Sequence, residues 1–170
     1  MERISNDIQA LMNQAEIEIE NFELKPGEKI IAYFSELPPI KGFPYRIILV
    51  ENPDGVIHSK FRQWDTSYNL TQWALGIYNL DRLRIIVDGK KISTTDKAML
   101  REQFSLLEQI KLPESISDEK AIVLDGSEWK FGINLTNENI NYTWKASTVA
   151  INLFVPIIEL MRKQHLDRIE

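Results

Sequence analysis

The sequence predicts an α+β protein in which helices pack on an antiparallel sheet built from hairpins. Two observations indicate this class. Short β-rich segments alternate with turn signals through the middle of the chain, and apolar residues recur at helical spacing near both ends. The 170 residues, 44% hydrophobic and 26% charged, have the size and composition of one globular domain. No linker or low-complexity tract divides them, so we expect a single domain over residues 1–170.

The first 23 residues predict an acidic helix. Apolar side chains recur at steps of three and four from Ile4 to Phe22, which is the stripe of an amphipathic helix. Ser5 is placed to cap its start. A period of two across residues 16–20 is typical of a half-buried strand, but the helical stripe has more matches. A Pro-Gly pair within residues 25–28 ends the element.

Residues 29–145 predict the sheet. β-rich runs start near Lys29, Tyr45, Val56 and Arg84, and the second and third of them flank an Asn-Pro-Asp-Gly turn. Asp-Gly is a strong signal for a hairpin turn. The sequence contains three such pairs that follow β-rich runs, and we expect a turn at each of them: Asp54-Gly55, Asp88-Gly89 and Asp125-Gly126.

Helices are expected within and after this sheet. Residues 94–110 predict an inserted helix that Ser93 or one of the two following threonines starts. Residues 65–81 are ambiguous but fit a short helix. A last helix is expected over 148–168, and Pro156 must kink it or lie in its first turn.

Several kinds of chemistry lack their usual residues. The chain has no cysteine and two histidines, His58 and His165, so we expect no metal site and no cofactor. Neither histidine lies in a serine-hydrolase motif, and neither a phosphate loop nor a Gly-x-Gly cluster is present. The carboxylates before the three Asp-Gly glycines could hold a divalent cation at one sheet edge, but the turn itself accounts for them.

The net charge of −5 is concentrated at the N-terminus, where six acidic residues face a single arginine within residues 1–23. A solvated helix face is the simplest reading, and the alternative is steering toward a basic partner. The chain lacks the basic footprint of a nucleic-acid-binding protein and an apolar run long enough for a membrane. With no apolar signal region at the start, we expect a cytoplasmic protein. The candidate partner-binding carboxylates are Glu16, Glu18, Glu20 and Glu23.

Tryptophan is the other candidate for an interface. Trp64, Trp73, Trp129 and Trp144 lie in or beside predicted strands, and such aromatics pack in cores or anchor interfaces. Trp64 and Asp65, at the end of a strand, form the pair that we select as a surface candidate.

The C-terminal third carries a resemblance. Residues 124–133, LDGSEWKFGI, are followed by the Tyr-Thr-Trp run at 142–144 and by a closing apolar helix. This pattern resembles small bacterial immunity proteins of polymorphic-toxin and contact-dependent inhibition systems, mainly over residues 121–145. The resemblance implies a non-catalytic protein that neutralises a toxin domain by occluding it, with a protein partner that could be basic. It transfers no functional residue to a numbered position.

Two other classes remain open. One is a carboxylate-based or metal-dependent enzyme that uses the Asp-Gly carboxylates. The other is a structural or assembly protein, monomer or homodimer, in which the apolar last helix supplies a two-fold face.

Overall fold

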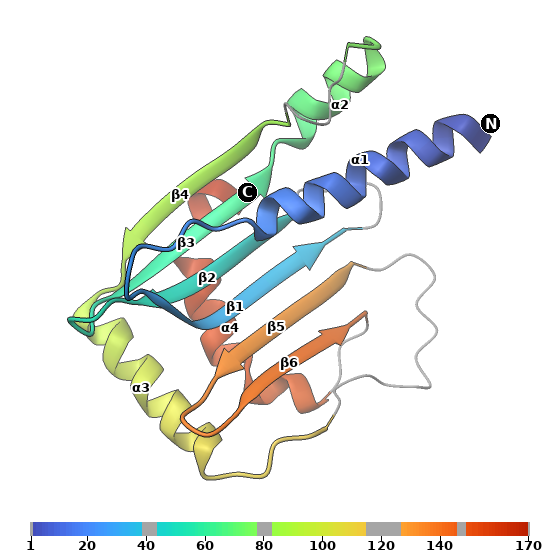
Figure 1. Cartoon of the computed structure of the whole chain (residues 1–170). Helices are drawn as coiled ribbons and strands as arrows, with labels where there is room; N and C mark the ends of the chain where they lie inside the picture. Colours follow the sequence, from blue (N-terminus) through green and yellow to red (C-terminus); the bar gives the residue numbers. More distant parts are fainter. Residues whose placement is uncertain (1, 39–43, 78–82, 115–126, 146–148, 170) are drawn as a thin grey trace.

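A six-stranded antiparallel sheet, ordered β4-β3-β2-β1-β5-β6, forms the centre of the computed structural model (Figure 1). The structure describes residues 2–38, 44–77, 83–114, 127–145 and 149–169. The strands are β1 Lys29–Leu37, β2 Tyr45–Glu51, β3 Ile57–Trp64, β4 Ile85–Lys91, β5 Glu128–Asn134 and β6 Asn139–Trp144. The predicted α+β class, with helices packed on a hairpin-built sheet, is confirmed.

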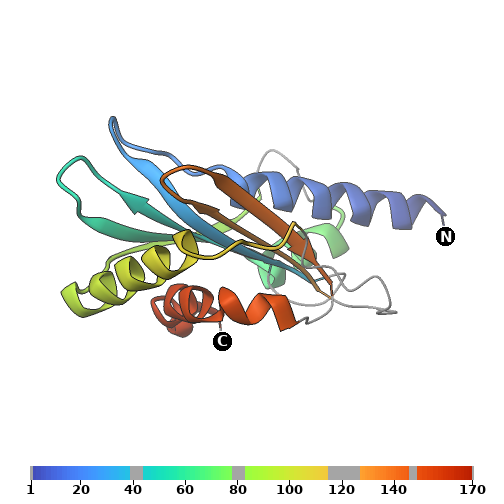
Figure 2. The same ribbon diagram turned by 90° about the horizontal axis from the view of Figure 1, so that it is seen from below.

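Helices cover the sheet on both faces (Figure 2). Helix α1 lies over one face, and α3 and α4 lie over the other. The described helices are α1 Glu2–Glu20, α2 Thr66–Ala74, α3 Thr94–Glu108, α4 Val155–Lys163 and the short α5 Leu166–Ile169, with a 3₁₀ turn, η2, at Val149–Leu153. We name the two sides of the sheet the α1 face and the α4 face.

Helix α1 places its apolar stripe against the α1 face. Leu11, Ala15 and Ile19 are fully buried and form a small cluster with Trp64 of β3. The helical reading of residues 16–20 is therefore correct. The helix begins at Glu2, so Ser5 lies inside it rather than at its cap.

The main core lies on the α4 face. Alternate residues of β2, namely Tyr45, Ile47 and Leu49, point into it, together with Phe61 of β3 and Phe131 of β5. Helix α4 buries Ile157, Ile158, Leu160 and Met161 against these strands. The apolar side of the last helix is buried against the sheet, so these residues do not supply the free dimer face that the sequence suggested.

The Asp-Gly pairs have different positions. Gly55 turns the β2–β3 hairpin at a φ of 72°, where glycine avoids the strain of a Cβ, and its N–H donates to the Asn52 carbonyl at 2.9 Å. The turn predicted at Asp88-Gly89 is wrong. Both residues lie inside β4, where Asp88 pairs with Phe61 and Gly89 with Lys60. The pair at 125–126 lies outside the described residues.

The C-terminal helix is divided where one helix was predicted. Pro156 lies in the first turn of α4, which is one of the two positions expected for it. Helix α4 ends at Lys163, and His165 separates it from α5. The inserted helix begins after Ser93, whose hydroxyl accepts the Asp96 N–H at 3.1 Å, and the short helix expected in 65–81 is α2.

Candidate functional site

The predicted acidic surface is paired with basic side chains of the sheet. Glu20 binds Arg46 at 2.5 Å, Glu16 binds Lys130, and a Glu18 carboxylate oxygen lies 3.9 Å from Arg62. The backbone carbonyl of Glu23 accepts a hydrogen bond from Lys60 at 3.0 Å. These contacts lie between the α1 face and the C-terminal part of α1 together with the segment that follows it. The field of the helix carboxylates is therefore locally compensated.

Lys130 shows the electrostatic effect of this pairing. Partial burial would lower the pKa of its amine, but the hydrogen bond to Glu16 and the nearby Glu20 and Glu128 outweigh burial and raise it. The amine thus stays charged and bound to α1. Pairs with this exposure contribute only about 0.2–1 kcal/mol each. They orient the helix, while the apolar contacts of its other side supply most of the adhesion.

Trp64 and Asp65 have structural positions. The Trp64 side chain is 1% exposed and lies in the cluster beneath α1, so it is not the surface residue that the sequence suggested. Its indole N–H has no hydrogen-bond partner among the described residues. Asp65 caps α2 by accepting the Tyr68 N–H at 3.0 Å, and it pairs with Arg84 at 3.2 Å.

A serine, a histidine and an aspartate meet on the α4 face, far apart in sequence. The Ser59 hydroxyl lies 2.8 Å from Nε2 of His165, and the Nδ1 atom of His165 lies 3.1 Å from Asp88. We call these residues the polar trio. In the arrangement that satisfies all three groups, Ser59 donates to Nε2 and the Nδ1–H donates to the carboxylate.

The charges of the trio follow from its surroundings. Burial lowers the pKa of His165, although Asp88 opposes this, so the imidazole is neutral near pH 7. Burial would raise the pKa of Asp88, but the bonds from His165 and from the Gly89 N–H outweigh burial and lower it. The trio is thus an ionised carboxylate, a neutral imidazole and a hydroxyl.

This order of groups is that of a serine hydrolase, but access differs. Ser59 and His165 are both 0% exposed, and Ser59 is held in the interior of β3 between β2 and β4. Neither residue lines the two cavities described below, the aromatic pocket beside α4 and the cavity on the α1 face. A nucleophile must reach a substrate carbonyl, and this hydroxyl has no open path to one.

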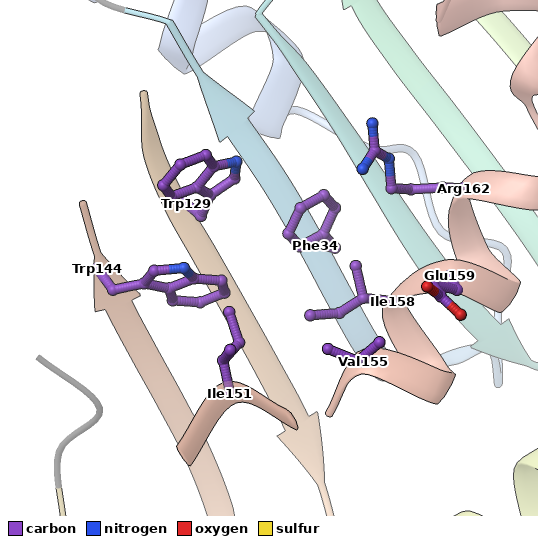
Figure 3. A pocket seen from close by; sticks show the side chains of 8 residues that line it. All are labelled: Phe34, Trp129, Trp144, Ile151, Val155, Ile158, Glu159 and Arg162. Atoms are coloured by element: carbon purple, nitrogen blue, oxygen red, sulfur yellow. The ribbon is translucent and has the colours of Figure 1, made fainter. Parts of the chain in front are cut away.

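An aromatic pocket opens beside α4, on the same face of the sheet (Figure 3). It has a volume of about 260 Å³. Trp129 and Trp144 are direct partners across the β5–β6 hairpin, and their rings stack at a centroid distance of 6.2 Å. Eight side chains line it: Phe34, Trp129, Trp144, Ile151, Val155, Ile158, Glu159 and Arg162.

The floor and rim of this pocket differ in polarity. Phe34, Trp144 and Ile158 are buried at its floor, whereas Glu159 and Arg162 are exposed on the α4 side. Neither of these charged side chains forms an ion pair within the described residues. Arg162 does hydrogen-bond Tyr45, whose hydroxyl donates to Glu36 at 2.8 Å. Burial and the Glu36 charge raise the pKa of Tyr45, so the phenol stays neutral.

A second cavity lies on the α1 face between β4 and the segment after α1. It encloses about 450 Å³ and includes Phe22, Lys60, Arg62 and Val87 among its lining residues. Its two cations are engaged: Lys60 binds Glu28 at 2.7 Å, and Arg62 donates to the Glu18 carbonyl at 2.9 Å. Although this cavity is larger than the aromatic pocket, its two cationic side chains are therefore less available to a ligand.

No three histidine or carboxylate side chains gather as a metal site within the described ranges. Asp54 lies at the β2–β3 turn and Asp88 in the middle of β4, so these two do not share the sheet edge that a ring of carboxylates would need. Asp125 lies outside the described residues.

Comparison with the models of protein families and with curated protein sequences finds no match to this chain. None of the described helices combines the length and the apolar character needed to cross a membrane.

Sequence reasoning missed both the trio and the pocket. The trio joins residues 59, 88 and 165, which no local spacing connects. The pocket had a partial signal, because Trp129 and Trp144 were both placed in or beside predicted strands, and a hairpin register can place them opposite each other. The contribution of α4 had no such signal.

Proposed function

We propose that this protein is a non-catalytic binding protein of the cytoplasm that neutralises a toxin domain by occluding it. The observation that carries the proposal is the aromatic pocket, which is open and apolar with two exposed charges at its rim. In the polar trio, in contrast, the Ser59 hydroxyl and the His165 ring are fully buried. The resemblance of residues 121–145 to bacterial immunity proteins supports the same class.

The pocket suits a single large side chain of a partner. Its volume of about 260 Å³ is slightly below the range of roughly 300–1,000 Å³ that is typical of cofactor and small-molecule sites. Aromatic residues that surround an inserted side chain are common centres of binding energy in protein interfaces. We therefore propose that a partner inserts one aromatic or branched side chain between Trp129 and α4.

The rim would fix the orientation of that partner. Glu159 and Arg162 lie one helical turn apart on α4 and carry opposite charges, so each can meet a complementary group on the bound domain. The acidic α1 contributes less in this scheme, because Glu16, Glu18 and Glu20 already face cations of the sheet.

The test uses the variable C-terminal domain of a toxin encoded beside this gene. Isothermal titration of the wild-type protein should show a one-to-one complex, and Trp129→Ala should weaken it by at least about tenfold, as for an interface anchor. Leu75→Ala is the matched control, because Leu75 is 64% exposed at the C-terminal cap of α2, away from the pocket. No complex with that domain, or equal affinity of the Trp129 variant, would contradict the proposal.

A second candidate, a serine hydrolase, is favoured by the geometry of the polar trio alone. Intact mass after incubation with a fluorophosphonate probe separates the two functions. The binding function predicts an unmodified chain, because Ser59 is fully buried. An adduct that disappears in Ser59→Ala would establish the hydrolase instead.

A further inference from the structure

The polar trio joins three elements near the β4 edge of the sheet. Ser59 belongs to β3, Asp88 to the edge strand β4, and His165 to the joint between α4 and α5. The His165 N–H also donates to the Arg162 carbonyl at 2.9 Å, which continues the last turn of α4. A single imidazole thus connects the end of α4 to two strands.

The ring of His165 lies in an apolar setting. It stacks on Phe61 with centroids 5.0 Å apart and planes 18° from parallel. Moving an imidazolium into such a site costs free energy unless its charge is compensated. Hydrogen bonds to Ser59 and Asp88 hold the neutral ring, so the joint is stable as long as the ring stays neutral.

The charged groups around the ring nearly balance. Strand β4 contributes Asp88 and Lys90, and α5 contributes Asp167 and Arg168. Lys90 binds Asp167 at 2.8 Å, so these two opposite charges compensate each other. Helix α3 contributes Asp96, which contacts the chain next to His165 through Lys163 and Gln164 at 3.5 and 3.3 Å. Among the described residues, Asp88 is the one carboxylate that bonds the ring directly.

We propose that the polar trio is a pH-responsive anchor that holds the C-terminal end of α4, and with it one wall of the aromatic pocket, on the sheet. Protonation of His165 removes the acceptor that Ser59 uses and places a charge beside Phe61. Opening of α4 and α5 exposes the imidazolium to water. This inference goes beyond the binding function and does not depend on it.

The physical basis is linkage between protonation and opening. A buried histidine that takes up its proton more readily after opening shifts the equilibrium toward the open form as pH falls. Between the ordinary value of 6.5 and the lower value in the closed form, opening should increase by up to about tenfold per pH unit. The pocket wall formed by Val155, Ile158 and Arg162 would loosen with it.

Amide hydrogen exchange of the free protein tests this between about pH 5 and pH 8. After correction for intrinsic rates, protection of residues 155–169 should fall as the pH is lowered, while the β2–β3 hairpin keeps its protection. Parallel loss in both regions would indicate global unfolding and would overturn a local anchor. Constant protection of α4 and α5 would overturn it as well.

The second histidine provides the matched control. His58 lies on β3 next to Ser59, with its side chain on the face of the sheet opposite to the trio. The pH dependence should persist in His58→Gln and disappear in His165→Gln. The reverse pattern would refute the anchor.

If the His165 variant does not fold, a titration of the imidazole signals of the wild-type protein tests the same proposal. The chain has two histidines, so both resonances are assignable with His58→Gln. The His165 resonance should titrate below the ordinary histidine value of 6.5. Titration of His165 at or above 6.5 would remove the basis of the proposal.

Discussion

The two faces of the sheet hold their helices by different means. On the α4 face, α4 and the strands bury large apolar side chains such as Phe131, Phe154 and Ile157 at 0% exposure. On the α1 face, three apolar residues of α1 meet Trp64, and a set of ion pairs lies beside them. The α4 face therefore supplies most of the stability, and the α1 face mainly fixes orientation.

The cavities follow the same division. The α1-face cavity is larger, but Lys60 and Arg62 in its lining are already bonded to the segment around α1. The α4-face pocket is smaller and presents Trp129 beside the exposed rim residues Glu159 and Arg162. The side chains that are available to a partner thus lie on the α4 face, which also contains the main core. A partner that binds there contacts the most stable part of the molecule.

The largest expected effect comes from adjacent residues of β5 that point to opposite faces. Phe131→Ala should lower the free energy of unfolding by about 3–5 kcal/mol, because it leaves a cavity beside Phe154. Lys130→Ala, the neighbour on the α1 face, should cost under about 1 kcal/mol. Urea unfolding measures both, and similar losses for the two variants would break the comparison of the faces.

Gly132 is an expected exception on the α1 face. A Cβ on Gly132 would lie 2.1 Å from the ring of Tyr33 and 2.6 Å from the Asn141 side chain. Arg46 holds the other side of that ring at 4.0 Å. Gly132→Ala should therefore cost about 1–3 kcal/mol by overpacking. Combining it with Tyr33→Ala should recover part of this loss, and full additivity in the double variant would contradict the contact.

The two faces should also differ in how their contributions to stability depend on pH. The pKa of His165 on the α4 face is lowered, so below 6.5 the unfolded chain takes up the proton first and stability falls with pH. The loss is at most about 1.4 kcal/mol per pH unit. The pKa values of Asp88 and Glu28 are also lowered, and their contribution disappears only near pH 4 and below. Thermal unfolding of the wild-type protein should show the loss of stability that begins below pH 6.5. His165→Gln should not show this loss.

The smallest effect should come from the Glu20–Arg46 pair on the α1 face. Its side chains are 42% and 14% exposed, so a double-mutant cycle with alanine should give a coupling energy of about 0.2–1 kcal/mol. Added salt should reduce it. A coupling of several kcal/mol would mean that the ion pairs, rather than the apolar stripe, hold α1 on the sheet.

Local patterns predicted most elements, and their failures are specific. The Asn52–Gly55 turn and the cap at Ser93 were expected, because both need particular residues at neighbouring positions. Asp88-Gly89 failed because β3 offered a full set of pairing partners, so the strand continued through a dipeptide that favours a turn. The division of the last helix at His165 depends on contacts with Ser59 and Asp88 that are remote in sequence.

The candidate site was less predictable than the fold. Glu16, Glu18 and Glu20 were candidates for binding a partner, and the tertiary structure gives each a cation from a distant strand. Trp64 was selected for the surface, whereas α1 covers it. In both cases the charge and aromatic content were correctly identified, but exposure depends on which element packs above.

The sequence by itself determined the α+β class, most of the helices and strands, and the placement of the acidic residues near the N-terminus. These properties arise from periodicity, capping and turn preferences that act over a few residues. Only the tertiary structure decided that Ser59, Asp88 and His165 meet, and that Trp129 and Trp144 form a pocket with α4. Such groupings depend on strand order and on the packing of α4 across the sheet, which local preferences do not specify.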